Sequence, residues 1–203
     1  MRPNALIGVV AAGFLLTLGM TLLAADGRPG ERSSDEDESR IQAGLRYAQV
    51  QGITLNFKKH NRALVGLGSY LVNAVGGCND CHTAPPFTLD PYAGVGAPKQ
   101  VNVACYLAGG TAFGPPPFGL PPKSPVSRDI TPWENRLPAG LSRNGFVRVM
   151  RTGEDPDNPG HVLRVMPWPV YQSMTDDDLR AIYEYLSAIP AITPGTCGVP
   201  SVS

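Results

Sequence analysis

The residues with the most specific chemistry lie in the segment GGCNDCHTAPP, residues 76–86. Cys78 and Cys81 are separated by two residues, and His82 follows Cys81 directly. Cysteines are placed close together in this way in a redox dithiol, in half of a zinc site, in part of an iron–sulfur cage and in a covalent haem attachment site. The rest of the sequence has to distinguish between these four chemistries.

The other two cysteines, Cys105 and Cys197, stand alone in the sequence. Zinc sites commonly use two paired ligand clusters, and the cysteine spacing fits none of the usual iron–sulfur runs. A thioredoxin-like dithiol would follow a strand, whereas a helix is expected directly before this motif. We therefore favour one haem c, attached covalently through Cys78 and Cys81, with His82 as an iron ligand.

Low-spin haem electron carriers use a second axial ligand, often methionine or histidine. Met150 lies on an apolar helical face and Met174 just before a helix, so both are expected to pack in the core. Met166 lies in VLRVMPWPVY, where two prolines stiffen an extended loop. Met166 is therefore predicted as the second ligand, and His161, in a turn-like stretch, is its competitor.

Three short helices are predicted to position these residues. Apolar residues recur at spacings of three and four over residues 62–75, and a pair of glycines ends the pattern. Residues 141–153 form a second amphipathic segment that ends at a glycine. The clearest helix covers residues 175–189, where Thr175 is a good N-cap. No run of residues predicts a strand, so the expected fold class is all-α, with short helices joined by long loops.

A proline- and glycine-rich insertion, residues 83–128, follows the cysteine motif. Such a composition sustains neither helices nor central strands. A loop of this length usually wraps or covers something. Its cysteine and scattered aromatic residues indicate that part of the insertion packs, and disorder is the alternative.

The start of the chain predicts export from the cytoplasm. Residues 5–25 contain no ionisable side chain. They fit a signal peptide cleaved near Ala24 or Ala25, and they are also long enough for an N-terminal membrane anchor. Both interpretations of residues 1–25 place the remainder of the chain outside the cytoplasm.

The expected domain organisation follows from these segments. Residues 26–57 are assigned to a charged linker and N-terminal extension, with the stretch 26–40 read as a solvated tether. The functional domain is expected at residues 58–192, followed by a tail at 193–203. A formal net charge of +0 gives no indication of a nucleic-acid partner.

With these motifs in view, the sequence resembles class I c-type cytochromes over about residues 60–192. In particular, it is similar to the single-haem domains of cytochromes that accompany bacterial periplasmic dehydrogenases. The segments that carry this resemblance are GSYLVNAVGGCNDCHTAP, the ITP at 130–132, FVRVMRTG, and MPWPVYQSMTDDDLRAIYEYLSAIP. The resemblance implies a class I cytochrome c fold around one haem. The long insertion and the single CxxCH motif depart from some relatives.

The resemblance also implies particular contacts. The first and last helices of the domain should cross near Gly66 or Tyr70 and Tyr183. A backbone carbonyl after the motif, from Pro85 or Pro86, should accept a hydrogen bond from the His82 imidazole. The resemblance further places three residues near the haem propionates: Ile130, Thr131 and Trp133.

Two hypotheses complete the sequence analysis. Because the compartment is oxidising, Cys105 and Cys197 are proposed to form a disulfide, with two free thiols as the alternative. The expected function is transfer of single electrons between redox protein partners, either in the bacterial periplasm or on a membrane facing it, without enzymatic activity. The alternatives are a haem peroxidase or gas sensor with a displaceable methionine, and a fixed cytochrome subunit of a membrane respiratory complex.

Overall fold

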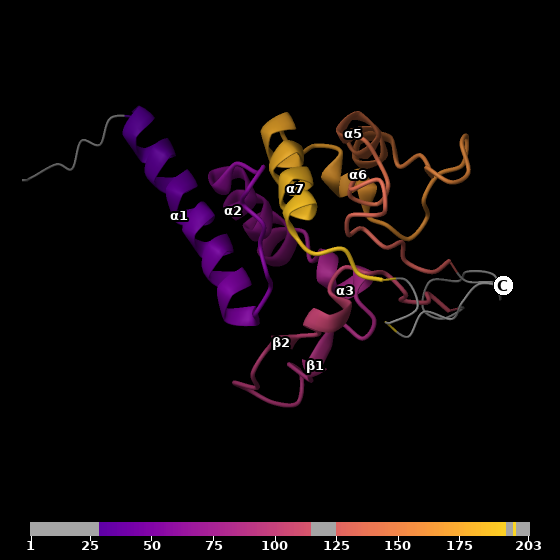
Figure 1. The fold of residues 1–203 in the computed structure, drawn as a ribbon, viewed down its shortest axis with the longest axis horizontal. Helices are drawn as coiled ribbons and strands as arrows, with labels where there is room; N and C mark the ends of the chain where they lie inside the picture. Colours follow the sequence, from indigo (N-terminus) through magenta and orange to yellow (C-terminus); the bar gives the residue numbers. More distant parts are fainter. Residues whose placement is uncertain (1–28, 115–124, 194–196, 198–203) are drawn as a thin grey trace, which may run out of the picture.

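The computed structural model describes residues 29–114, 125–193 and 197 of the 203-residue chain. The described part is mostly helical, with long loops and a small sheet (Figure 1), and it is broadly compatible with a cytochrome c fold. Its helical elements are α1 (Pro29–Gln51), α2 (Arg62–Tyr70), the π-helical η1 (Leu71–Val75), α3 (Cys78–His82), the 3-10 turn η2 (Val103–Cys105), α5 (Arg143–Thr152), α6 (Trp168–Tyr171) and α7 (Asp176–Ala188).

The sheet corrects the expectation that the chain has no strands. Strands β1 (Phe87–Leu89) and β2 (Gln100–Val101) pair antiparallel within the proline-rich insertion. The pair is short and contains an irregular register between Phe87 and Leu89. Such short strands, without a clear alternation of apolar and polar residues, leave little periodic signal in a sequence.

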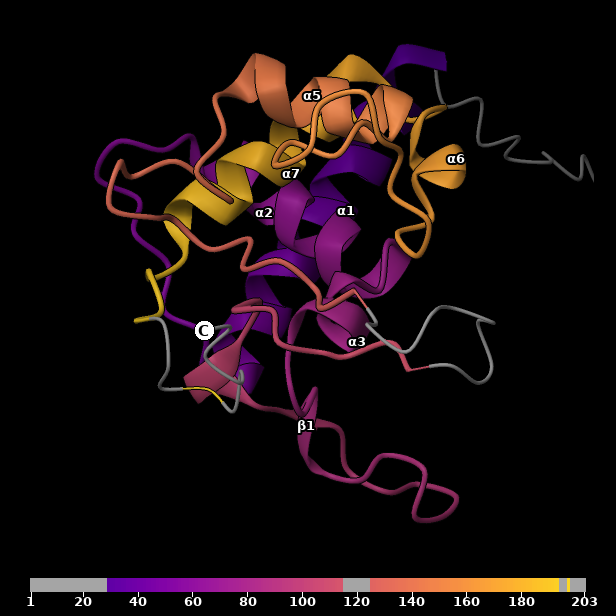
Figure 2. The same ribbon diagram turned by 90° about the vertical axis from the view of Figure 1, so that its right-hand side faces the viewer.

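Helix α2 lies between α1 and α7 in Figure 1 and packs against both; Figure 2 shows the same three helices after a 90° turn. A Cβ atom on Gly68 would lie 2.0 Å from the carbonyl oxygen of Ala181, and one on Gly44 would lie 2.0 Å from that of Gly66. Backbone therefore meets backbone at both crossings. The helices cross near the expected residues, and the contact with α7 is made by Gly68, midway between Gly66 and Tyr70, whereas Gly66 itself faces α1.

On α7 the crossing lies around Tyr183, as expected, but the contact with Gly68 is made by Ala181 and Tyr185 on either side of it. Tyr183 itself faces another helix. Its hydroxyl donates to the carbonyl of Leu141, 3.0 Å away, and its ring packs on Phe146 of α5. Tyr185 lies at the α2 crossing instead, with its Cβ 2.6 Å from the position that a Cβ of Gly68 would take.

Helix α1 replaces most of the tether expected at residues 26–40. Arg40 lies within 3.8 Å of Glu36 and 3.6 Å of Asp37, at the spacing that supports a helix. Further along, Leu45 and Ala48 are buried. The helix is thus supported by its own charge pairs and by packing on α2. The predicted boundaries of the domain stay predictions.

Local signals fix the ends of the other helices as expected. Thr175 and Asp178 form a capping box at the start of α7. Ser142 accepts from the amide of Gly145 at the start of α5, and Gly153 ends that helix with a φ of 68°. The predicted helix at 62–75 is divided, because its second half adopts the π-helical form of η1.

A buried polar cluster holds the insertion to the helices. The Tyr106 hydroxyl donates to Asn73 Oδ1 over 2.5 Å and lies 2.9 Å from the Tyr185 hydroxyl. Asn73 in turn donates to the carbonyl of Ser69. The adjoining Leu107 is fully buried. Part of the insertion therefore packs, as expected, whereas Tyr92 and Val95 in the loop after β1 are exposed. Residues 115–124 lie outside the described part.

The disulfide hypothesis is confirmed, because Cys105 is bonded to Cys197 with their Cα atoms 5.3 Å apart. This bond connects the insertion to the tail. The apolar segment at residues 5–25 lies outside the described ranges. Among the helices that the structure does describe, none has the length and apolar character needed to cross a membrane.

Candidate haem site

The candidate site is built on the single helical turn of α3. Gly77 precedes the turn with a left-handed φ of 59°, and the two free cysteines, Cys78 and Cys81, lie on the turn together with His82. A Cβ on Gly76 would lie 3.3 Å from the Cys78 sulfur, so the backbone before the turn passes close to that thiol. The fold thus presents two thiols and an imidazole from five consecutive residues.

The imidazole of His82 is held in one tautomer. Its Nδ1 lies 2.8 Å from the carbonyl oxygen of Arg128, and a carbonyl only accepts, so Nδ1 carries the proton. Burial lowers the pKa of His82, which favours the neutral ring. The lone pair of Nε2 is therefore available to a metal.

The source of this carbonyl corrects the expectation from the resemblance. Pro85 and Pro86 do not accept from His82. The Pro86 carbonyl accepts from the Asn79 side chain over 3.2 Å, and the Pro85 carbonyl accepts from the Asn102 side chain over 3.1 Å. Both carbonyls are thus engaged by asparagine side chains, and the acceptor for His82 comes instead from Arg128, at the far end of the insertion.

The backbone around His82 is fixed on its other side as well. The amide of Gly109 donates to the His82 carbonyl over 2.6 Å, and the Thr83 hydroxyl accepts from the amide of Leu107. Gly109 has a φ of 75°, and a Cβ there would lie 2.4 Å from the carbonyl oxygen of Ser127. Residues 107–109 of the insertion therefore pack between the end of α3 and the backbone of Ser127 and Arg128.

Met166 lies in the loop between α5 and α6. It is half-buried and packs against the main apolar core. Its carbonyl accepts from the amide of Trp168 over 2.8 Å, and the Trp168 indole donates to the carbonyl of Leu163 over 3.1 Å. A Cβ on Gly153 would lie 2.3 Å from that indole. The Met166 loop is thus fixed by a tryptophan that rests on the end of α5.

Tyr171 connects this loop to the cysteine turn. Its hydroxyl donates to the carbonyl of Gly76 over 2.8 Å. Burial, with smaller contributions from Cys78 and Cys81, raises the pKa of Tyr171 to about 12, so it stays a neutral donor. The sequence did not single out Tyr171. Its place five residues after Met166 was the one sequence signal for a role near this loop. Its contact with Gly76, 95 residues away, could not be predicted because it depends on the fold.

The other candidate ligands lie in the surroundings that the sequence predicts for them. Met150 is buried in the main apolar core, and Met174 is half-buried against it. His161 is exposed, and its amide donates to the carbonyl of Asn158 within a turn. Met166 stays the predicted second ligand.

The side chains fit covalent haem attachment better than the other cysteine chemistries. The disulfide occupies Cys105 and Cys197, which removes them from a four-cysteine cage. Over the ranges that the structure describes, no three His, Cys, Asp or Glu side chains gather as a metal site. Burial raises the pKa of Cys78 to about 12, whereas reactive dithiols have lowered pKa values. Two free thiols beside a neutral imidazole remain. These are the side chains of a c-type haem attachment site, where the thiols bond the porphyrin and the imidazole binds the iron.

The segment expected near the haem propionates begins directly after Arg128. Thr131 is fully buried and its amide donates to Asp129 Oδ1 over 2.8 Å. Trp133 is 39% exposed, and the Arg128 guanidinium lies 4.3 Å from the centre of its ring. The assignment of this segment to the propionates stays a prediction.

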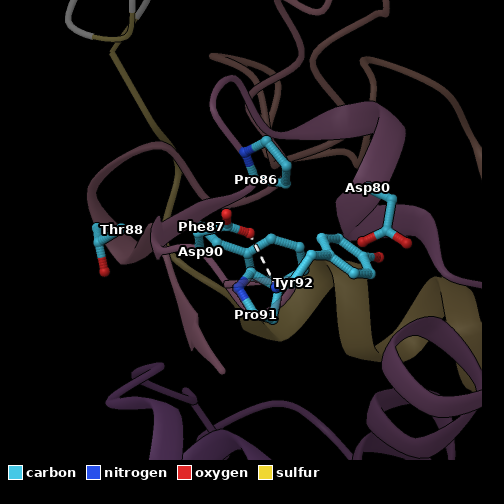
Figure 3. Close-up of a pocket in the computed structure, with 7 residues that line it drawn as sticks. All are labelled: Asp80, Pro86, Phe87, Thr88, Asp90, Pro91 and Tyr92. Atoms are coloured by element: carbon cyan, nitrogen blue, oxygen red, sulfur yellow. Dashed lines mark hydrogen bonds between the residues drawn. The ribbon is translucent and has the colours of Figure 1, made fainter. Parts of the chain in front are cut away.

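Figure 3 shows a separate, open pocket of about 510 Å³ between α3 and the loop after β1. Asp80 enters it from the cysteine turn, and the remaining lining comes from Pro86 to Thr88 and Asp90 to Tyr92. The pocket is lined by neither the two thiols nor the His82 ring. It is therefore a feature of the insertion, distinct from the thiol and imidazole site.

Comparison with known proteins gives one informative similarity. The chain is 30% identical over 137 residues to the cytochrome c subunit of a quinone alcohol dehydrogenase from Gluconobacter oxydans (strain 621H). The alignment covers 64% of this chain and 25% of the relative, so the chain spans about a quarter of that protein's length. No family model matches the chain, and no solved structure matches it. The similarity supports a cytochrome c-like relationship and, at a coarse level, a role in electron transfer with haem c.

Proposed function

We propose that the chain is a class I c-type cytochrome that carries one electron at a time between redox protein partners. In this proposal one haem c is bonded to Cys78 and Cys81, and His82 and Met166 are the axial ligands. The observation that carries the proposal is the α3 turn, where two free thiols adjoin a buried imidazole that donates from Nδ1 to a carbonyl 2.8 Å away.

Each part of the chain has a stated task in this function. When bound, the haem supplies a one-electron Fe(III)/Fe(II) couple. Arg128 holds the His82 ring in the tautomer that leaves Nε2 free, as an outer hydrogen bond commonly does for a ligating histidine. Trp168 stiffens the loop of Met166 through the hydrogen bond from its indole to the Leu163 carbonyl. A methionine opposite a histidine favours a high reduction potential.

The partners and the compartment belong to the same proposal. The similar Gluconobacter protein is a cytochrome c subunit of a dehydrogenase. A dehydrogenase, an oxidase or a membrane complex is therefore the class of partner we propose. The Cys105–Cys197 disulfide supports an oxidising compartment, which we take to be the periplasm or the periplasmic face of a membrane.

The first experiment counts covalent haem on exported protein. A pyridine haem assay after acid–acetone extraction should find one haem per chain, because thioether bonds survive the extraction. The double variant Cys78→Ser, Cys81→Ser should lose the retained haem. The control Cys105→Ser should keep it, since that cysteine lies in the disulfide. Wild-type protein that loses all colour on extraction would contradict the proposal.

The second experiment tests the distal ligand and the carrier function together. Met166→Ala should remove the methionine–iron absorption feature and lower the reduction potential. The control Met174→Leu changes another half-buried methionine and should leave both unchanged. If Met166→Ala kept the native spectrum and potential, the sixth position would be open or displaceable, and a peroxidase or gas sensor would be the better assignment.

A further inference from the structure

Arg128 joins three segments of the chain that are remote in sequence. Its backbone carbonyl accepts from His82 Nδ1 over 2.8 Å. Its Nε and Nη2 donate to the carbonyl of Ala139 over 3.2 and 3.0 Å, and its Nη1 pairs with the carboxylate of Asp157. The guanidinium also stacks over the ring of Trp133. One residue therefore contacts the proximal histidine by its backbone and the loop before Met166 by its side chain.

The loop that Asp157 belongs to is internally rigid. The amide of Asp157 donates to Asp155 Oδ1 over 3.0 Å, and the amide of Asp155 donates to the carbonyl of His161 over 2.9 Å. At its end, the amide of Leu163 donates to the carbonyl of Gly153 over 2.8 Å. These bonds connect Asp157 to His161 and anchor Leu163, whose carbonyl accepts from the Trp168 indole beside Met166.

We propose that Arg128 is a positioning residue that fixes the two axial-ligand segments relative to each other. The proposal deepens the proposed function and rests on it. On the proximal side, Arg128 sets the carbonyl that orients His82. On the distal side, its ion pair with Asp157 holds the loop that leads to Met166. Loss of either contact of the side chain loosens the distal ligand while the fold remains.

The geometry explains why an arginine suits this position. Two of its nitrogens bind one carbonyl and a third binds a carboxylate, which a lysine ammonium on a flexible stem does not reproduce in one geometry. The Arg128 side chain is 22% exposed and that of Asp157 is 68% exposed. An ion pair this exposed contributes little to global stability, so the expected effect is local.

The test measures how readily an external ligand displaces the distal one. Imidazole is titrated into the ferric haem-loaded protein, and the methionine–iron feature is followed. Arg128→Lys and Asp157→Asn should each tighten imidazole binding about two- to fivefold, the range expected from an exposed ion pair. The double variant should match the stronger single variant, because both changes break the same link. The control Arg40→Met, which removes exposed pairs with Glu36 and Asp37 on α1, should bind imidazole as the wild type does.

The reduction potential separates positioning from a simple charge effect. If Arg128 and Asp157 acted only as charges, Arg128→Met would lower the potential and Asp157→Asn would raise it, with imidazole binding unchanged. If they position the ligand, both variants weaken methionine binding, so both tighten imidazole binding. Opposite shifts without that tightening, or a loss of thermal stability alone, would overturn the proposal.

Two checks keep the outcomes distinct. If Arg128 variants do not fold, Asp157→Asn decides by itself, since it alters an exposed carboxylate.

A wild-type protein without covalent haem defeats the proposed function. A wild-type protein with haem and a methionine–iron feature, whose variants all bind imidazole equally, defeats this inference alone. Amide hydrogen exchange over residues 155–163 should rise in Asp157→Asn, and it reports the link independently of the haem.

Discussion

Replacing Gly153 with alanine tests how the Met166 loop is held. Gly153 ends α5 with a φ of 68°, and a Cβ there would lie 2.3 Å from Cε2 and Nε1 of Trp168. Movement of the indole would strain or break the hydrogen bond from its Nε1 to the carbonyl of Leu163. The added methyl group must therefore displace Trp168 or distort the end of α5.

The magnitude follows from two separate costs. A left-handed backbone costs a residue with a Cβ about 1–2 kcal/mol. Inserting a methyl group into an occupied space costs about 1–3 kcal/mol more. Gly153→Ala should therefore lower the free energy of unfolding by about 2–5 kcal/mol. Part of this cost can be relieved by local opening, which would release Met166 before the whole domain unfolds.

Gly160→Ala is the matched control. Gly160 has a φ of 85°, and a Cβ there would meet no atom within 4 Å. Gly160→Ala should therefore lower the free energy of unfolding only by the backbone cost, about 1–2 kcal/mol. Denaturant unfolding of both variants isolates the Trp168 contact, and the methionine–iron feature reports the loop. Equal unfolding midpoints, with the feature intact in both variants, would refute the assignment of Trp168 as the support of this loop.

Three further changes test other parts of the fold. Gly68→Ala should lower the free energy of unfolding by about 3 kcal/mol or more, measured by denaturant unfolding, because backbone meets backbone at the α2–α7 crossing. The control Gly94→Ala, in an open loop, should be near neutral. Cys105→Ser should cost about 2–5 kcal/mol, since the bond to Cys197 spans 92 residues, and no change in the midpoint would count against a formed disulfide. Tyr171→Phe should lower the free energy of unfolding by about 1 kcal/mol, because the hydrogen bond to Gly76 is lost. It should also increase amide exchange in the Met166 loop. Unchanged exchange would show that the hydroxyl does not support the loop.

Helix positions could be predicted largely from the sequence because their signals are local. Thr175 precedes three aspartates and an apolar stripe, and it caps α7 as expected. The glycine after MRT ends α5 for the same local reason. The π-helical form of η1 had no such signal, because Asn73 turns inward to reach hydroxyls of Tyr106 and Tyr185 that lie far away in the sequence.

The charged start of α1 shows the limit of composition. Dense acidic residues without an apolar period indicate a solvated linker, and that interpretation holds for an isolated chain. In the structure the same charges occupy the exposed surface of a helix. Later in that helix, Gly44 and Leu45 contact α2, and Ala48 is buried. The decisive contact lies with another helix, so the first half of α1 carries no sign of it.

At the candidate site, the residue types could be predicted but their outer contacts could not. The CxxCH spacing identified the thiols and imidazole, and a proline-framed loop suggested Met166. The acceptor for His82 comes from Arg128, at the far end of the insertion, and a plain backbone carbonyl has no sequence signature. Arg128 itself stood out neither by spacing nor by composition, because its importance comes from the three segments that meet there.

The burial of Cys78 has a consequence for the order in which the molecule matures. Only a thiolate attacks a disulfide or an electrophile efficiently, and a pKa of about 12 keeps this thiol protonated at neutral pH. Burial also raises the pKa of Cys81, so both free thiols exchange slowly with the Cys105–Cys197 disulfide in the folded chain. The same burial would hinder any enzyme that must modify Cys78. We therefore expect thioether formation to precede closure of this fold, on a chain that is still open.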